Sequence, residues 1–334
     1  MGRSPITRGL VAWQAPRMRA VRIDGPRQVA VVNLDEPSAG PGEALVRVRV
    51  AAICATDRRL ATHGKPAPRI PGHEVVGVLE DGTAVGVQPN VGCGRCASCA
   101  LGLENRCPDH VDIGIQRDGG LAEWIVMPEG HVVPLNGFPF DLAPSIEPLA
   151  CCQHAVEMLA VTSDEAAVVV GAGTLGIIGM WALQAAGARV GVVQRSEARR
   201  HLAAELGADA AIGPDEDVAA ALGSRPAVAL VTAPGVEALS WAVEQVDVGG
   251  RVHAFAGSPG GAQIDANLVH YRHLRLMGST GSTVDDYRRA RDLARSGSVP
   301  LDRLPSRTVS LDEVPEILLD TRPDPRTLRI LVRP

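Results

Sequence analysis

The sequence predicts an α/β protein in which a doubly wound parallel sheet is joined to a compact, barrel-like β domain. From about Ala166 onward, apolar runs such as AAVVV and RVGVV alternate with helical stretches. Strands that are apolar throughout are typical of a parallel sheet covered on both faces. Between Met18 and Glu147 the apolar runs are short and alternating, as in ALVRVRVAAI, and Gly- and Pro-rich turns separate them. That pattern indicates half-buried β-strands.

The same patterns suggest how the two domains divide the chain. We expect residues 1–17 to be a disordered leader and residues 18–147 to form the β domain. Residues 148–298 are expected to form the α/β domain. Strand character returns near the end of the chain in RTVSLDEV and TLRILVRP, so residues 299–334 should complete the β domain. The α/β domain is therefore expected to be inserted into the β domain.

The composition narrows the functional class. The chain has 334 residues, 46% of them hydrophobic, and a formal net charge of −5, so nothing favours nucleic acid as a partner. No apolar run reaches the roughly 18 residues that could span a bilayer. The start of the sequence lacks the apolar core of a secretory signal. We therefore expect a cytoplasmic protein that acts on a small molecule, not at a membrane.

Four of the seven cysteines form a cluster within a short segment. They are Cys93, Cys96, Cys99 and Cys107. Thiolates are soft ligands, and four of them close a tetrahedral zinc site that has no open position. The spacing therefore predicts a structural zinc ion.

A glycine-rich loop lies between an apolar strand and a helix. Its sequence GAGTLG places Gly171, Gly173 and Gly176 around Thr174 and Leu175. Glycines allow a tight turn and a close backbone approach to a pyrophosphate, which the helix N-terminus then attracts. Because the strand and helix stand where the motif requires them, the loop predicts a dinucleotide site.

The residues after the second strand of this domain bear on the choice of cofactor. NAD enzymes usually place a carboxylate there to hold the ribose 2′-hydroxyl. Here Gln194, Arg195 and Ser196 come first, and Arg199 follows Glu197. A guanidinium can pair with a 2′-phosphate, so we expect NADP(H) to be preferred over NAD(H). The alternative is that the arginines form a solvated helix face and Gln194 binds the ribose.

Three separate segments carry the donor types of a catalytic zinc, which needs about three protein ligands and an open position. The candidate ligands are Cys54, His73, Glu74 and Glu147. Each has an ordinary alternative: a core cysteine, a loop histidine, or a carboxylate at a helix start. Their co-occurrence with the cysteine cluster and the glycine loop favours the metal.

The combination resembles the zinc-containing medium-chain dehydrogenase/reductase superfamily, the alcohol dehydrogenase family. The resemblance rests on CATD at Cys54, PGHE at Pro71, CGRCASCALGLENRC at Cys93, EPLACCQHA at Glu147 and GAGTLG at Gly171. EPLA is similar to the branch that contains sorbitol and other polyol dehydrogenases and threonine dehydrogenases. The resemblance implies a GroES-like catalytic domain and a Rossmann domain, with the active site between them.

The resemblance also implies roles for individual residues. Cys54 and His73 would be the first two ligands of a catalytic zinc, and Glu74 and Glu147 compete for the remaining position, directly or through water. Thr56 matches the hydroxyl that relays the alcohol proton, and Asp57 matches a carboxylate that steadies the zinc ligands. Two zinc ions per chain and a homodimer or homotetramer are implied.

Two features depart from the family pattern. The segment between His73 and Cys93 looks trimmed, which could reshape the substrate cleft. Arg58 and Arg59 follow Asp57, where some relatives carry a relay histidine, and they could contact an anion or lie in a solvated turn. Cys151 and Cys152 lie close to Glu147, and we interpret both as small packing residues. The five motifs that carry the resemblance are intact.

The expected function is oxidation of a secondary alcohol of polyol, cyclitol or sugar type by NAD(P), and a biosynthetic role would fit it. One alternative is a reductase of small ketones or aldehydes, or an amino-alcohol enzyme similar to threonine dehydrogenase. A second alternative is a binding protein that has kept the fold and lost catalysis. The complete set of candidate ligands weighs against this second alternative.

Overall fold

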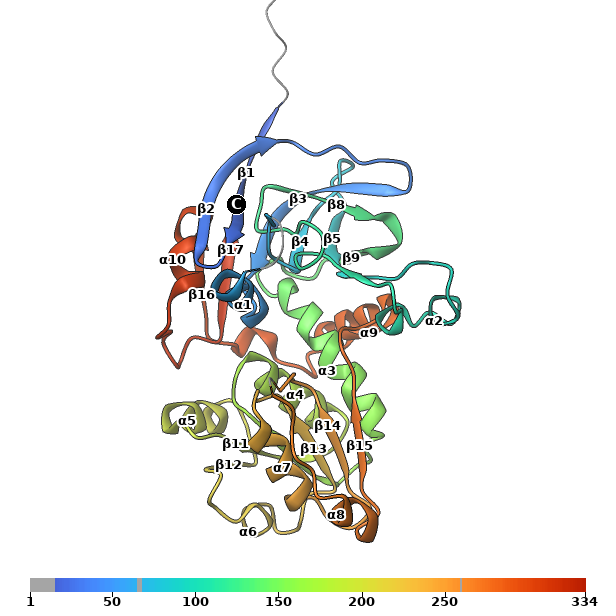
Figure 1. Cartoon of the computed structure of the whole chain (residues 1–334), viewed down its shortest axis with the longest axis vertical. Helices are drawn as coiled ribbons and strands as arrows, with labels where there is room; N and C mark the ends of the chain where they lie inside the picture. The colour runs from blue at the N-terminus through green and yellow to red at the C-terminus, as the bar shows by residue number, and fades with distance from the viewer. Residues whose placement is uncertain (1–15, 65–67, 259) are drawn as a thin grey trace, which may run out of the picture.

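The computed structural model describes residues 16–64, 68–258 and 260–334. Its longest axis joins a β-rich part to an α/β part (Figure 1). Most of the expected leader, residues 1–15, lies outside the described residues. The first strand, β1, begins at Arg17, one residue before the expected start of the folded part.

A parallel sheet of six strands forms the core of the α/β part. The strand order is β12-β11-β10-β13-β14-β15, and neighbours pair in parallel. The strands are β10 Ala166–Val170, β11 Arg189–Val193, β12 Ala210–Ile212, β13 Val228–Val231, β14 Arg251–Ala254 and β15 Arg275–Gly278. The sheet confirms the predicted doubly wound class. Its order reverses between β10 and β13, which is where such sheets bind ligands.

Both faces of this sheet are covered by helices. Ala167 and Val169 of β10 pack in one buried cluster with α3, α4 and α9, whereas Val168 and Val170 pack in another with α6 and α7. Successive strand residues point to opposite faces, so two covered faces require an uninterrupted apolar run. The helices are α3 Ile146–Leu159, α4 Thr174–Ala185, α5 Glu197–Glu205, α6 Val218–Leu222, α7 Val236–Gln245, α8 Ala266–Tyr271 and α9 Val284–Arg295.

A seven-stranded sheet forms the β-rich part. Its order is β16-β17-β3-β4-β5-β9, and β8 also pairs with β3. Along β3, Val46 and Val48 are buried while Arg47 and Arg49 are exposed, so the alternation in the sequence predicts the buried face correctly. The strands are β3 Glu43–Ala52, β4 Glu74–Val78, β5 Ala84–Val87, β8 Trp124–Pro128, β9 Val132–Pro134, β16 Ser306–Ser310 and β17 Arg329–Arg333. A separate hairpin joins β1 Arg17–Gly25 to β2 Gln28–Asp35.

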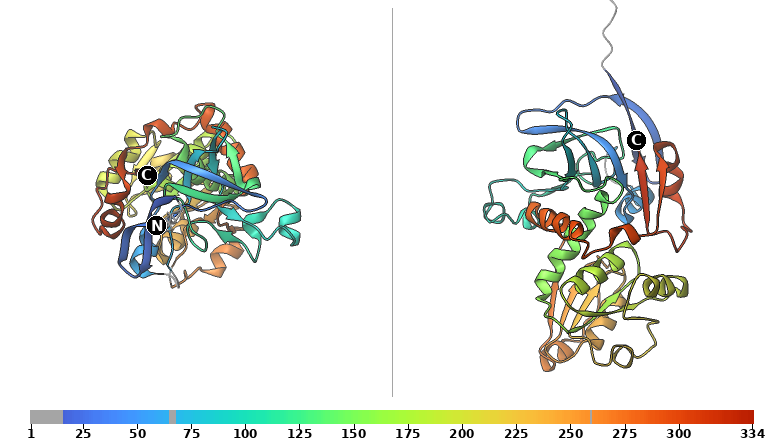
Figure 2. Two further views of the ribbon diagram at one scale, coloured as in Figure 1. Left: turned by 90° about the horizontal axis from the view of Figure 1, so that it is seen from above. Right: turned by 180° about the vertical axis from the view of Figure 1, so that it is seen from behind.

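The end of the chain returns to the β-rich part, as Figure 2 shows from behind. β17 pairs antiparallel with β3, with Leu331 opposite Ala52. Helix α10, Val314–Leu319, packs against α1, Ala55–His63. This return carries Arg329 into the interior next to β4.

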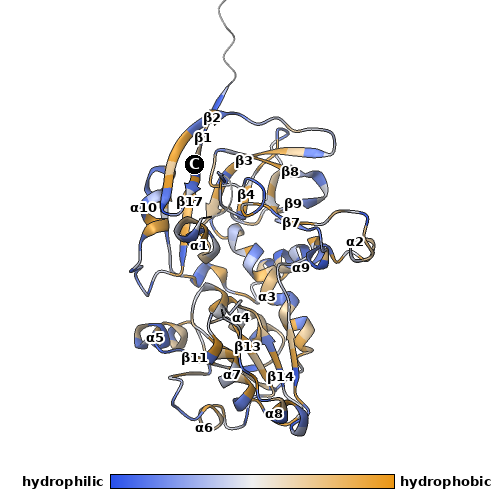
Figure 3. Ribbon diagram, viewed as in Figure 1, coloured by the Kyte–Doolittle hydropathy of each residue, from blue (hydrophilic) through white to orange (hydrophobic). Residues whose placement is uncertain are grey.

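Helices α3 and α9 connect the two parts of the molecule. They pack against each other, and Arg291 and Arg295 of α9 donate hydrogen bonds to the carbonyl oxygens of Pro134 and Asn136 in the β-rich part. Figure 3 shows hydrophobic residues along the strands of both sheets and along part of α3. The element that we expect to close the α/β domain is therefore anchored to the β domain as well.

The shorter elements lie mainly around the β-rich part. A loop that carries α2 projects from its side (Figure 1). The short elements are α2 Ala97–Ala100, β6 Asn90–Val91, β7 Val111–Asp112 and the 3-10 helices η1 Glu104–Arg106, η2 Glu129–His131, η3 Ala143–Ser145, η4 Leu301–Arg303 and η5 Leu311–Glu313. The trimmed segment forms a tight β4–β5 hairpin, closed by a bond from Leu79 N–H to the Thr83 carbonyl. None of the described helices has the length and apolar character needed to cross a membrane.

Candidate active site

A cavity of about 170 Å³ brings together the reacting residues that the sequence singles out. Cys54, Thr56, His73, Glu74 and Glu147 all line it. One ligand atom from each of Cys54, His73 and Glu74 lies within 4.8 Å of the other two. These residues come from the N-terminus of α1, the start of β4 with the residue before it, and the first turn of α3, so only the folded chain assembles them.

Asp57 ties together the two segments that carry the thiol and the imidazole. Its carboxylate accepts hydrogen bonds from the backbone N–H of Cys54 at 2.8 Å and from that of Gly72 at 3.0 Å. Asp57 is completely buried at the third position of α1, where Cys54 is the N-cap. It therefore fixes both segments through their backbones, without entering the cavity.

His73 is held in place by its neighbour and by Asp57. Gly72 has a φ of +100°, and a Cβ there would lie 2.7 Å from the backbone nitrogen of Leu121, so only glycine fits before the imidazole. His73 Nδ1 lies 3.7 Å from Asp57 Oδ1 and has no hydrogen-bond partner among the described residues. The imidazole is oriented, and its hydrogen-bonding capacity is left incomplete.

Glu74 pairs with a residue that the sequence does not single out. Its carboxylate forms an ion pair with Arg329 of β17, and each side chain is only 3% exposed. A buried carboxylate is costly without such a partner. The pair fixes the Glu74 carboxylate beside Cys54 and His73.

Glu147 faces the same cavity from the first turn of α3. The thiol of Cys151, one turn later, points at its Oε1 at 3.5 Å. Cys151 therefore lies at the site, unlike our interpretation of it as a packing residue. Cys152 is completely buried in the core and does pack as expected. The difference follows from helix geometry, because residues four apart share a face.

The electrostatics of the cavity fit a bound cation. Burial raises the pKa of the Cys54 thiol and raises that of Glu147 to about 7. Burial by itself lowers the pKa of His73, but Cys54 and Asp57 raise it well above its usual value. A low-dielectric cavity thus disfavours the anionic thiolate and carboxylate, and a divalent ion would reverse that preference. A thiol, an imidazole and carboxylates are also the donors that zinc prefers.

Thr56, Arg58 and Arg59 all follow Cys54 closely in the sequence, but only Thr56 lines the cavity. Thr56 lines the cavity and accepts a hydrogen bond of 3.3 Å from Arg59. Arg58 donates to the carbonyl oxygen of Ile317 at 2.6 Å, so it anchors α10. Neither arginine lines the cavity.

The four-cysteine cluster is assembled in the projecting loop. Its four sulfur atoms lie within 4.8 Å of one another, and the N–H of Cys93 points at the Cys107 sulfur at 3.4 Å. The backbone N–H of Arg95 lowers the pKa of the Cys93 thiol to about 7. A closed set of four soft donors fits a structural zinc ion.

The glycine loop forms one wall of a second cavity, of about 580 Å³, at the carboxyl ends of β10 and β11. Gly173 caps the N-terminus of α4. A Cβ on Gly176 would collide with the carbonyl oxygen of Gly171, which explains the third glycine of the motif. Thr174 donates a 2.5 Å bond to the Leu328 carbonyl, and Leu175 lines the cavity of Cys54. The helix thus links the two cavities.

The polar residues that follow β11 differ in whether they line this cavity. Gln194, Arg195 and Arg199 line this second cavity. Arg199 also donates to the Ala172 carbonyl at 2.9 Å, which ties it to the glycine loop. Ser196 is exposed beside Arg195, and its N–H donates to the Gln194 side chain at 3.2 Å. Of the two arginines that line the cavity, Arg195 is therefore the one whose guanidinium donates no hydrogen bond to a described residue.

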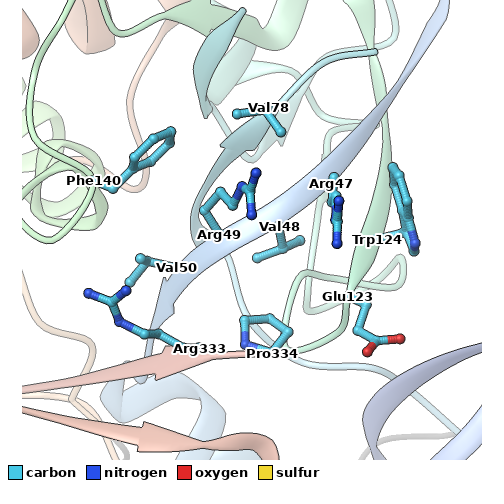
Figure 4. Close-up of a pocket in the computed structure, with 10 residues that line it drawn as sticks. All are labelled: Arg47, Val48, Arg49, Val50, Val78, Glu123, Trp124, Phe140, Arg333 and Pro334. Carbon is cyan, nitrogen blue, oxygen red and sulfur yellow. The ribbon is translucent and has the colours of Figure 1, made fainter. Parts of the chain in front are cut away.

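Another hollow, of about 580 Å³, lies on the outer face of β3 (Figure 4). Arg47 lies over the Trp124 ring, with its guanidinium carbon 5.9 Å from the ring centre. Arg333 forms an ion pair with Asp141. This hollow shares no lining residue with the cavity of Cys54, so it is separate from the reacting centre.

Sequence reasoning misses several residues that line or support the cavity. Asn90 and Asp112 line it, Cys151 contacts Glu147, and Arg329 pairs with Glu74. For Cys151, the spacing of four residues from Glu147 was an available signal. The other contacts join segments that are far apart in the chain, and no local pattern marks them.

Two family models match the chain in the order of its two parts. The Alcohol dehydrogenase GroES-like domain matches residues 40–137. The Zinc-binding dehydrogenase model matches residues 174–296. The first range contains the four-cysteine loop, and the second begins in the glycine loop.

Individual relatives cover almost the whole chain. L-galactonate-5-dehydrogenase of Escherichia coli K12 is 30% identical over 298 residues, 84% of this chain and 88% of the relative. D-altritol 5-dehydrogenase of Agrobacterium fabrum is 30% identical over 335 residues, 94% of this chain and 98% of the relative. A solved structure from Sinorhizobium meliloti 1021, described as a zinc-binding dehydrogenase bound to NADP, is 31% identical with a TM-score of 0.88, covering 96% of this chain and 100% of the other.

Proposed function

Because the chain belongs to the alcohol dehydrogenase family of zinc-containing medium-chain dehydrogenases, we propose that it transfers a hydride between a secondary alcohol of polyol, cyclitol or sugar type and NADP. The observation that carries this proposal is the assembly of Cys54, His73 and Glu74 in one cavity, next to the helix of the glycine loop. The family establishes an NAD(P)-dependent oxidoreductase. The substrate class and the cofactor preference are our proposals.

We assign the catalytic zinc to Cys54 and His73, with Glu74 or Glu147 as the third ligand. The proximity of Glu74 to the other two favours it, whereas its ion pair with Arg329 already occupies part of its carboxylate. Glu147 has no such cationic partner at hydrogen-bonding distance among the described residues. A second zinc is assigned to the four cysteines of the projecting loop.

In this proposal, the residues of the chain bind and orient the substrate and move its proton. A bound zinc ion would supply a Lewis acid, and a bound nicotinamide would supply the hydride acceptor or donor. Thr56 lines the cavity, so its hydroxyl can relay the proton of the substrate hydroxyl, taking up that proton while it passes its own on toward solvent. Asp57 holds the Cys54 and His73 segments in register. Gly171, Gly173 and Gly176 let the backbone approach the pyrophosphate.

The test of the function is an absorbance screen for NADPH formation with polyols, cyclitols and sugar alcohols, with ketones offered in the reverse direction. The same sample is analysed for zinc, and we expect two ions per chain. One zinc per chain and no turnover would favour a binding protein that has lost catalysis. Turnover of small ketones and aldehydes alone, or of threonine alone, would favour the alternative enzyme classes.

Arg195→Ala is expected to lower kcat/KM for NADPH by about 10- to 100-fold, because a charge-assisted hydrogen bond to a phosphate contributes ~1.5–3 kcal/mol. The value for NADH should stay within about twofold, since NADH lacks the 2′-phosphate. Arg47→Ala, on the outer face of β3, is the control and should change neither value. A wild-type preference for NADH would contradict the assignment.

Three further expectations accompany the proposed function. We propose residues 18–147 with 299–334 as the catalytic domain and 148–298 as the cofactor domain, which the pairing of β17 with β3 supports. A homodimer or homotetramer stays a prediction. So does the cytoplasmic location.

A further inference from the structure

We propose that the physiological alcohol carries an ammonium group and that Asp112 binds it. This inference rests on the proposed function, because it assigns the substrate of the same cavity. Asp112 lies in β7 and lines the cavity together with Cys54, His73 and Glu147. A cavity of about 170 Å³ is small, so one short molecule can contact both the reacting centre and Asp112.

A network of buried side chains fixes the first oxygen of Asp112. Asn90 donates from Nδ2 to Asp112 Oδ1 at 2.7 Å. The Asn90 side chain is itself held, because its Oδ1 accepts from the N–H of Ser282 at 2.9 Å and from Gln88 at 3.1 Å. Asn90 is only 8% exposed. The carboxylate of Asp112 is therefore positioned before any substrate arrives.

The second oxygen of Asp112 lacks a donor. The nearest basic atom is His110 Nε2, 3.5 Å from Asp112 Oδ2. His110 Nδ1 lies 2.8 Å from the carbonyl oxygen of Cys107, to which it can only donate. None of the described residues donates a hydrogen bond to Asp112 Oδ2, and the Asp112 side chain is 18% exposed.

The charge balance of the cavity leaves this carboxylate uncompensated. Glu74 is balanced by Arg329. A zinc ion would balance the Cys54 thiolate and the Glu147 carboxylate. No lysine or arginine stands among the described residues that line the cavity. The remaining negative charge is that of Asp112, and an ammonium group on the substrate would neutralise it.

The same balance disfavours substrates that carry a carboxylate. A second anion in so small a cavity would lie close to Asp112, no lysine or arginine stands among the described lining residues to compensate it, and like charges repel. The two relatives named above differ in this respect, since L-galactonate is an acid and D-altritol is uncharged. The structure therefore separates this chain from sugar-acid dehydrogenases and extends the polyol class toward amino alcohols.

The test compares substrates that differ in a single group. Glucamine, glucitol and gluconate form one series, galactamine, galactitol and galactonate form a second, and an aminocyclitol with its parent cyclitol forms a third. We expect kcat/KM for the amine to exceed that of the parent alcohol by about tenfold or more, because hydrogen bonds to charged groups are the strong ones. The acids should be the poorest substrates.

Two variants that each remove one negative charge show whether the preference for the amine comes from Asp112. Asp112→Asn keeps the shape and should bring the amine and the parent alcohol within about threefold of each other. Asp109→Asn removes one carboxylate from the same loop, at an exposed position outside the cavity, and should keep the full preference. Calorimetry on the zinc-loaded protein with NADPH gives a readout without turnover. There, Asp112→Asn should weaken binding of the amine about tenfold more than it weakens binding of the parent alcohol.

The outcomes separate this inference from the proposed function. Oxidation of the acids as well as the amines would overturn the inference, as would an Asp112→Asn variant that keeps the amine preference. If no probe is turned over while both zinc ions are bound, the proposed function fails. The calorimetric comparison of amine with alcohol then decides the inference alone, and equal affinities would reject it.

Discussion

His73→Ala is expected to lower kcat/KM with any accepted alcohol by about a thousandfold and to reduce the zinc content from two ions per chain to one. The imidazole is one of three donors within 4.8 Å of one another. Loss of Lewis-acid stabilisation worth ~4 kcal/mol corresponds to about a thousandfold in rate. The measurements are steady-state kinetics and elemental analysis of the same preparation.

The control for this variant is another histidine. His201→Ala lies on α5, where the side chain is 68% exposed, and it should keep both the rate and the zinc content. If His73→Ala retains two zinc ions and activity within about tenfold of the wild type, the assigned metal centre is incorrect.

The same measurements can decide between the two carboxylates. Glu147→Gln and Glu74→Gln each remove one candidate ligand, and the variant that loses zinc identifies the direct one. Glu74→Gln also leaves Arg329 buried without its partner, which is destabilising in itself. Its zinc content must therefore be compared with its thermal unfolding midpoint, whereas Glu147→Gln can be read from zinc content directly.

Cys107→Ala is expected to remove the structural zinc and to lower the thermal unfolding midpoint by about 10 °C. The site is closed by four thiolates from one loop, and binding of such an ion contributes folding free energy directly. A loss of ~3–5 kcal/mol corresponds to about 10 °C at roughly 2–4 °C per kcal/mol. Scanning calorimetry and zinc analysis check the two parts of the expectation.

Cys152→Ala is the matched control for the cysteine variant. Cys152 is also buried, but it packs in the hydrophobic core of the α/β part. Its removal should lower the midpoint only slightly and leave both zinc ions in place. A Cys107→Ala protein that still binds two zinc ions would show that the four sulfurs do not hold a metal together.

Some features of this protein are determined by short segments of the sequence. The run AAVVV predicts β10 because both faces of a parallel strand are buried. The spacing of the four cysteines brings their sulfurs together because one loop carries them all. GAGTLG predicts the turn before α4, where Gly171 and Gly176 approach each other. In each case the decisive interactions lie within a few residues of one another.

Other features depend on contacts between distant segments, and only the tertiary structure decides them. The sequence offers Glu74 and Glu147 as equals, and the return of β17 into the β domain gives Glu74 its buried partner Arg329. Asp112 lies in an unremarkable stretch of sequence until β7 pairs with β6 and places it in the wall of the same cavity. Local patterns report periodicity and spacing, whereas the balance of buried charges depends on which segments meet in space.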